Sequence, residues 1–239
     1  MKLRDFSTLT FDCYGTLIDW ETGIHEALSP WLAAQGVTPE RDQVLEAFAR
    51  QESAQQADTP GMLYPELLAA VHARLAAHWQ LPADPEAAQR FGASVRDWPP
   101  FDDSTAALAY LKQHYRLVIL SNVDRASFTA SNARLGVAFD AVYTAQDFGS
   151  YKPDPANFTF MLNALRDSGI GKGEILHTAQ SLFHDHVPAH AAGLATCWID
   201  RRNDRSGFGA TAPPPRPVQT NFHFASMAAL ADAHRNEQL

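Results

Sequence analysis

Short apolar runs and longer stretches with helical spacing alternate along most of this 239-residue chain. The short runs predict strands, and the run 117–120 is apolar throughout, as in a parallel strand that is buried on both faces. Runs of this kind lie at 9–11, 117–120, 141–143, 175–179 and 196–199. Strands that alternate with helices predict an α/β fold with a doubly wound, Rossmann-like parallel sheet.

One long interval departs from this alternation. From 20 to 95 the apolar residues recur at helical spacing in four stretches, with no strand pattern between them. Because the interval follows the first strand directly, we expect it to lie as a lid over the carboxyl end of that strand. The sequence therefore predicts a core domain of residues 1–19 and 96–239, with a helical cap domain of residues 20–95 inserted after strand one.

Composition and charge narrow the class of protein. A 46% apolar content is that of a globular protein, and a net charge of −8 argues against nucleic acid, whose phosphates attract basic patches. No apolar stretch approaches the ~20 residues that span a bilayer, and the N-terminus has no signal-like pattern. We therefore expect a cytoplasmic protein whose partner is a small-molecule substrate, with no membrane contact. A homodimer through an apolar face of the cap is left open.

Polar side chains follow the predicted strands at the points where they end. Asp12 follows the first strand, Ser121 and Asn122 follow the second, Lys152 lies in the loop after the third, and Asp185 comes shortly after the fourth. Taken singly, each has an ordinary explanation as a helix cap, a turn residue or a solvated side chain. Because ligands of open α/β sheets bind outside the carboxyl ends of the strands, the set together predicts a binding site at that edge.

This order of motifs resembles that of the haloacid dehalogenase (HAD) superfamily over essentially the whole chain. Residues 12–16, Asp-Cys-Tyr-Gly-Thr, match the first motif of that superfamily. Ser121 matches the second motif, Lys152 the third, and residues 180–185 the fourth. The helical interval matches the cap that members carry after the first motif. The resemblance implies a HAD-like fold and an enzyme whose nucleophile is Asp12.

Two positions favour the 2-haloacid dehalogenase (type II)-like branch of the superfamily. Phosphatases of the superfamily place a second aspartate two residues after the nucleophile, where this chain has Tyr14. Their magnesium-binding fourth motif has an aspartate where this chain has Gln180. Asp-x-Tyr-Gly-Thr is instead similar to the signature of metal-independent 2-haloacid dehalogenases. The resemblance therefore implies no cofactor and no metal ligand, with Mg²⁺ only under the alternative of a phosphatase with altered motifs.

The resemblance also implies a reaction and a set of site residues. In this branch a carboxylate displaces halide from a short 2-haloalkanoic acid, and water then hydrolyses the aspartyl ester to release a 2-hydroxy acid. The residues expected to be catalytic are Asp12, Lys152 and Asp185. The residues expected to bind substrate are Tyr14, Thr16, Arg50, Ser121, Asn122 and His184.

Within that set, the expected roles differ. Arg50 and Asn122 would receive the halide, while Ser121 and Lys152 would hold the substrate carboxylate. Lys152 would also keep Asp12 ionised, because a nearby opposite charge lowers a carboxyl pKa.

Three departures from the branch leave alternatives open. Leu182 stands where the well-described dehalogenases have asparagine, and Phe158 stands where they have tyrosine, so water activation is expected to differ. His184 replaces an aromatic residue. Either His184, with His186 and His190, is an exposed ring at a helix start, or it donates to a compact halide pocket that favours fluoroacetate. A HAD-fold protein with weak or lost turnover is a further alternative.

Overall fold

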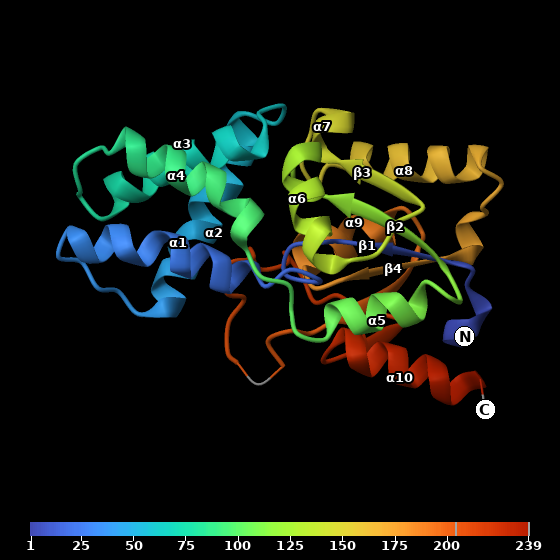
Figure 1. The fold of residues 1–239 in the computed structure, drawn as a ribbon. Coiled ribbons are helices and arrows are strands. Elements are labelled where there is room, and N and C mark those ends of the chain that lie inside the picture. The colour runs from blue at the N-terminus through green and yellow to red at the C-terminus, as the bar shows by residue number, and fades with distance from the viewer. Residues whose placement is uncertain (204, 239) are drawn as a thin grey trace.

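The parallel sheet forms the centre of the computed structural model, which describes residues 1–203 and 205–238 (Figure 1). Within these residues six strands lie in the order β3-β2-β1-β4-β5-β6, and every neighbouring pair is parallel. The strands are β1 Thr8–Phe11, β2 Arg116–Ser121, β3 Ala141–Thr144, β4 Ile175–Ala179, β5 Ala195–Ile199 and β6 Phe222–Phe224. The predicted doubly wound α/β fold is confirmed. Only β6, a three-residue edge strand, lies outside the sequence prediction.

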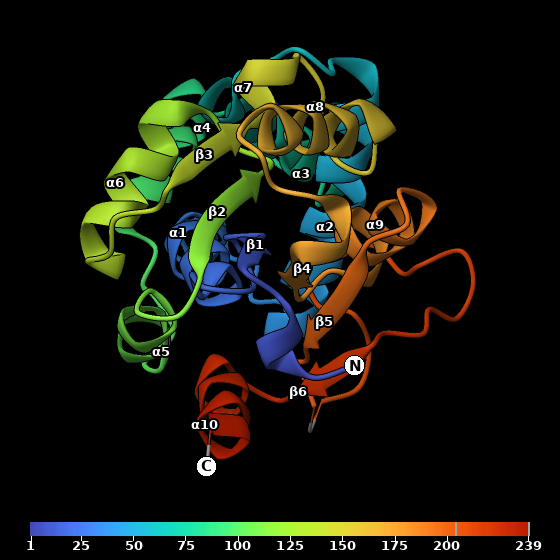
Figure 2. The same ribbon diagram turned by 90° about the vertical axis from the view of Figure 1, so that its right-hand side faces the viewer.

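Helices cover both faces of the sheet (Figure 2). Successive side chains of a strand point to opposite faces, and β2 shows this directly. Leu117 and Ile119 belong to one apolar cluster, and Val118 and Leu120 to another. The first cluster includes residues of α5 Ser104–Leu111, α6 Arg125–Leu135 and α10 Met227–Gln238. The second includes residues of α8 Pro155–Asp167 and α9 Val187–Ala191. Burial on both faces explains why the strands are continuous apolar runs.

The register of the central strands brings their carboxyl ends together. β1 pairs with β2 on one side and with β4 on the other, so that Phe11 lies opposite both Ile119 and Thr178. The chain therefore leaves β1, β2 and β4 at the same edge of the sheet. This edge is where an open α/β sheet presents a ligand site.

The interval that follows β1 forms a helical group beside this edge (Figure 1). Its helices are α1 Trp20–Ala34, α2 Arg41–Asp58, α3 Tyr64–His78 and α4 Pro85–Ala93. They fall within the range 20–95 expected for the cap, and we call them the cap helices. That residues 20–95 form a separate domain stays a prediction. None of the described helices is long and apolar enough to cross a membrane.

Close packing of α3 against α4 gives the first testable prediction. A Cβ at Gly92 would lie 2.4 Å from the carbonyl oxygen of Pro65. Because backbone cannot move aside as a flexible side chain can, Gly92→Ala should lower the free energy of unfolding by about 1–3 kcal/mol. Urea unfolding measures this. The control is Gly173→Ala, where no atom lies within 4 Å of the added Cβ. An equal loss in both variants would contradict the prediction.

Candidate active site

The turn after β1 orients the side chain of Asp12. Gly15 adopts φ +92°, which a residue with a Cβ adopts only under strain. The turn brings the Thr16 hydroxyl back to donate to Asp12 Oδ2 at 2.9 Å, and Thr16 Oγ1 accepts from the backbone N–H of Gln180 at 2.9 Å. Thr16 is fully buried. The structure therefore places Thr16, which was expected to bind substrate, as a residue that positions the carboxylate of Asp12.

The Lys152 ammonium lies between two carboxylates. Its Nζ donates to Asp12 Oδ1 at 2.9 Å, to Asp185 Oδ1 at 2.7 Å and to the carbonyl oxygen of Leu120 at 2.9 Å. An ammonium has three N–H donors, so these contacts use all of them. Lys152 is only 1% exposed. The expected role of holding the substrate carboxylate is therefore not what the structure shows: Lys152 binds protein groups on every side.

Asp185 is held from a second direction. It lies in a π-helical turn, η4 Leu182–His186, just beyond β4. The His177 ring nitrogen Nε2 lies 3.0 Å from Asp185 Oδ1, and Nδ1 of the same ring lies 2.8 Å from Thr10 Oγ1. Asp185 Oδ2 is buried and has no hydrogen-bond partner within the described residues. Asp185 thus anchors Lys152 and leaves one oxygen unused.

The surroundings shift the pKa values of the Asp12 and Asp185 carboxyl groups in opposite directions. Burial raises the pKa of Asp12, and although Lys152 and Thr16 lower it in part, the net direction is upward. Burial acts on Asp185 in the same sense, but Lys152 and His177 outweigh it and hold the pKa of Asp185 well below its ordinary value. Lys152 does lower the Asp12 pKa, as expected, but burial raises it by more. Asp12 is the more basic carboxylate, as a nucleophile should be.

Asn122 and Tyr14 have protein partners, whereas Ser121, the last residue of β2, has a hydroxyl without one within the described residues. The Asn122 amide donates to the Lys152 carbonyl at 3.0 Å and accepts from the Lys152 N–H at 2.7 Å, so this side chain holds the loop that carries the lysine. The Ser121 hydroxyl is buried without a partner within the described residues. The Tyr14 hydroxyl lies 2.7 Å from Ser131 Oγ on α6, which turns the phenol toward the core.

His184 lies at the Asp12 cavity and is buried. The interpretation as an exposed ring is wrong for His184 and His186, which the structure buries, and holds for His190. Ser181 Oγ accepts the His184 backbone N–H at 2.9 Å and lies 3.2 Å from His184 Nδ1. If that hydroxyl donates its proton to Nδ1, the proton of the ring is on Nε2, which has no partner within the described residues. Burial lowers the pKa of His184 to about 4, so the ring is neutral at pH 7.

Side chains of the cap helices complete the cavity that contains Asp12. Glu52 and Gln56 of α2 and Tyr64 of α3 line it, and its volume is about 30 Å³, room for one or two water molecules. Arg50, the cap residue expected to receive the halide, is exposed and does not line this cavity. The structure corrects that prediction: the cap side chains at Asp12 are a carboxyl, an amide and a phenol.

The helical phase of α2 explains the difference. Glu52 lies four residues after the buried Phe48, and Gln56 four residues after Glu52, so all three share one face of the helix. Arg50 is two positions from Glu52, which turns it roughly 160° to the other side. The apolar stripe continued by polar residues was the sequence signal that identifies Glu52 and Gln56.

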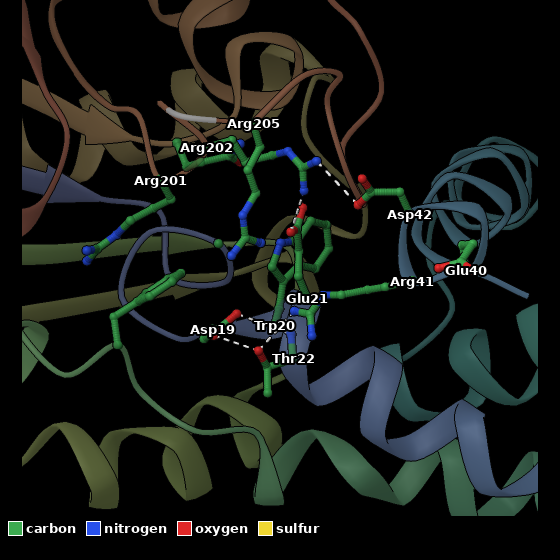
Figure 3. A pocket seen from close by; sticks show the side chains of 13 residues that line it. Asp19, Trp20, Glu21, Thr22, Glu40, Arg41, Asp42, Arg201, Arg202 and Arg205 are labelled. Carbon is green, nitrogen blue, oxygen red and sulfur yellow. Dashed lines mark hydrogen bonds and ion pairs between the residues drawn. The ribbon is translucent and has the colours of Figure 1, made fainter.

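A wider pocket of about 460 Å³ lies beside the Asp12 cavity, and the indole of Trp20 lines both (Figure 3). Figure 3 shows Arg202, from the loop after β5, reaching across to the cap helices. Its Nη1 lies 2.7 Å from Glu21 Oε2 of α1, and its Nη2 lies 3.4 Å from Asp42 Oδ1 of α2. Arg202 is itself buried, so these contacts tie the cap helices to the core.

Comparisons with known proteins agree with this architecture. The model of a hydrolase family, described as haloacid dehalogenase-like hydrolase, matches residues 6–178. The solved L-2-haloacid dehalogenase PA0810 is similar with a TM-score of 0.76 and 23% identity, over 97% of this chain and 99% of that one. The defluorinating L-2-haloacid dehalogenase Rha0230 has a TM-score of 0.75 and 22% identity, over 96% of this chain and 95% of that one.

A third similar structure is a magnesium-bound HAD-hydrolase, YfnB from Bacillus subtilis. Its TM-score is 0.74 at 18% identity, over 95% of this chain and 97% of that one. At such identities the likeness concerns the fold alone. No curated protein sequence matches the chain.

The Lys152 contacts lead to a stability prediction. Replacement of Lys152 by methionine leaves two buried carboxyl groups without their cation, so the free energy of unfolding at pH 7 should fall by about 3–5 kcal/mol. The matched control is Lys112→Met, which breaks a part-exposed pair with Asp140 and should cost about 0–1 kcal/mol. Urea unfolding compares the two. Similar losses in both variants would contradict the assigned role of Lys152.

Proposed function

Because the chain belongs to the haloacid dehalogenase-like hydrolase family, we propose that it hydrolyses the carbon–halogen bond of short 2-haloalkanoic acids. The family match covers more than half of the chain and includes β1, β2, β3 and most of β4. The choice of substrate class rests on the site itself.

The main support for this substrate class is the identity and surroundings of Tyr14. Two residues after the nucleophile, a phosphatase needs an acid to protonate the departing alcohol. Here the phenol is buried, burial raises its pKa well above the usual range, and its hydroxyl lies 2.7 Å from Ser131. A halide leaves as a stable anion and needs no such proton. A site with a nucleophilic carboxylate and no acid at this position therefore suits halide displacement.

The proposed reaction has two steps. An oxygen of Asp12 attacks the halogen-bearing carbon of the substrate in line with the carbon–halogen bond, so that a C–O bond forms, the carbon–halogen bond breaks and halide leaves. Water then adds to the carboxyl carbon of Asp12 and releases the 2-hydroxy acid. Lys152, which contacts Asp12 Oδ1 at 2.9 Å, stabilises the negative charge on that oxygen during the second step.

We further propose that the reaction needs no metal. Magnesium takes a near-octahedral set of oxygen ligands, chiefly carboxylates. Here the Lys152 ammonium lies between Asp12 and Asp185, and the neutral Gln180 accepts a hydrogen bond from Thr211 at 3.2 Å. Within the described residues, no group of three or more His, Cys, Asp or Glu side chains is arranged to hold a metal ion. The residues present do not fit magnesium.

We propose fluoroacetate as one substrate of the enzyme. His184 Nε2 is buried at the cavity and has no partner among the residues that the structure describes, and fluoride is the halide that gains most from a hydrogen-bond donor. The known defluorinating enzyme shares the fold, and that likeness does not itself extend to this chain's substrate.

Halide release from a panel of 2-haloacids tests the function. The wild-type protein should release halide from at least chloroacetate or fluoroacetate in the presence of EDTA, and Asp12→Asn should lower the rate by about 10⁴-fold or more. Chloride and fluoride electrodes follow the reaction. Undiminished release by Asp12→Asn, or EDTA-sensitive phosphate release from phosphate esters instead of halide release, would reject the proposal.

His184 gives a separate prediction about halide preference. His184→Ala removes the unpartnered donor, so the ratio of the fluoroacetate to the chloroacetate rate should fall by about tenfold, as expected for one hydrogen bond to an anion. His190→Ala serves as the control, because that ring is exposed. The same ratio in wild type and His184→Ala would refute the assigned role.

A further inference from the structure

A buried carboxyl group of the cap lies at the cavity that contains Asp12. Glu52 of α2 is only 2% exposed, and it lines the same cavity as Asp12. Its Oε1 accepts a hydrogen bond from the Tyr64 hydroxyl at 2.7 Å. No other hydrogen bond to Glu52 occurs within the described residues, so Oε2 is left for whatever occupies the cavity. A carboxyl group is rarely buried without a charged partner, and this one needs a reason.

The contacts between cap and core set the place of Glu52. Arg202 bridges from the core loop to Glu21 and Asp42, as Figure 3 shows, and Ala210 of the same loop donates its N–H to Glu21 Oε1 at 3.1 Å. These contacts hold α1 and α2 against the core. Glu52 of the cap helices and Asp12 of the core both line this cavity, so a water inside it lies between a cap wall and a core wall.

The second step of the proposed reaction needs a base for the attacking water, and few groups at the cavity qualify. Asp12 is esterified at that stage. Both carboxylates raise the pKa of Lys152 against the effect of burial, so it stays protonated. Asp185 accepts from Lys152 and His177, and these contacts make it a weak base. His184 is also a weak base, because burial lowers its pKa. Glu52 is left.

We propose that Glu52 is the general base of ester hydrolysis and that Tyr64 orients it. This inference rests on the proposed function and adds the group that completes the turnover. Tyr64 binds one carboxylate oxygen and leaves the other to accept a proton from water. The arrangement is that of a base aligned by a third group.

The proton balance closes without a further reactant. Water adds to the carboxyl carbon of Asp12 while Glu52 takes one of its protons, which gives a tetrahedral intermediate. The bond from this carbon to the oxygen of the 2-hydroxy acid then breaks. Glu52 returns the proton to that departing oxygen. The other proton of the water remains on the carboxyl group of Asp12 and passes to solvent, so that Asp12 is a carboxylate again. Glu52 therefore ends the cycle in the form in which it began.

The acidity of Glu52 suits this role. Burial raises its pKa to about 7, although the Tyr64 hydroxyl lowers it in part, and a base works best when its pKa lies near the working pH. The hydrolysis step should therefore accelerate as pH rises through about 7, where Glu52 loses its proton. Other titratable or charged groups facing it across the cavity or from packed elements are Tyr14, Tyr64, Tyr151, Asp12, Lys152, His184 and Asp185.

Single-turnover kinetics with chloroacetate test the proposal. In the wild type, chloride and glycolate should both be released, with the glycolate step rising through pH 7. Glu52→Gln should release one chloride per active site at a near-normal rate and then stall, with glycolate release slowed by about 10²–10⁴-fold. Intact-protein mass spectrometry of the Glu52→Gln variant should detect the ester on Asp12. The control is Glu46→Gln, the same change at an exposed position of the same helix.

A second variant covers the case in which Glu52→Gln fails to fold. Tyr64→Phe removes the hydrogen bond that lowers the Glu52 pKa, so the midpoint of the pH profile for glycolate release should move upward. Glycolate release by Glu52→Gln within about threefold of wild type, or an unmoved midpoint in Tyr64→Phe, would overturn the inference. A wild type that releases no chloride from any haloacid would instead overturn the proposed function, and the inference with it.

Discussion

The site depends on one buried cation shared by two carboxylates. Taking an ammonium and a carboxylate out of water costs several kcal/mol for each ion, and only close mutual contact offsets that cost. Lys152 meets Asp12 at 2.9 Å and Asp185 at 2.7 Å, from segments far apart in the chain. The turn after β1, the loop after β3 and the turn after β4 must therefore converge on one point. Asn122, which bonds both backbone groups of Lys152, helps to hold this loop in place.

Three carboxyl groups at the site differ in acidity because their surroundings differ. Asp185 is held strongly acidic by Lys152 and His177, whereas burial leaves Asp12 more basic than usual. Among the described residues Glu52 has only a neutral phenol as partner, and burial raises its pKa to about 7. Environment, not residue type, thus separates the anchor, the nucleophile and the group proposed to handle protons.

The convergence of Asp12, Lys152 and Asp185 was predictable because it follows from topology. Parallel strands present their carboxyl ends at one edge, so residues at strand ends meet there whatever the details of packing. The role of Arg50 was not predictable in the same way. On a helix a shift of two positions moves a side chain to the opposite face, and Glu52 therefore lies where Arg50 was expected. Thr16 and Asn122 likewise reached the site but with protein partners, because local turn geometry decides where short polar side chains point.

The sequence by itself determined the α/β class, the helical insertion after β1, and that Tyr14 stands two residues after Asp12, the residue proposed as the nucleophile. The fold features follow from the period of apolar positions, and the proposal for Asp12 follows from its motif, both of which are local properties. Only the tertiary structure decided which cap side chains face Asp12, that His184 and His186 are buried, and in which direction each carboxyl pKa moves. Those outcomes depend on distances of a few ångströms between segments remote in the chain and on the exclusion of water, and no local pattern encodes either.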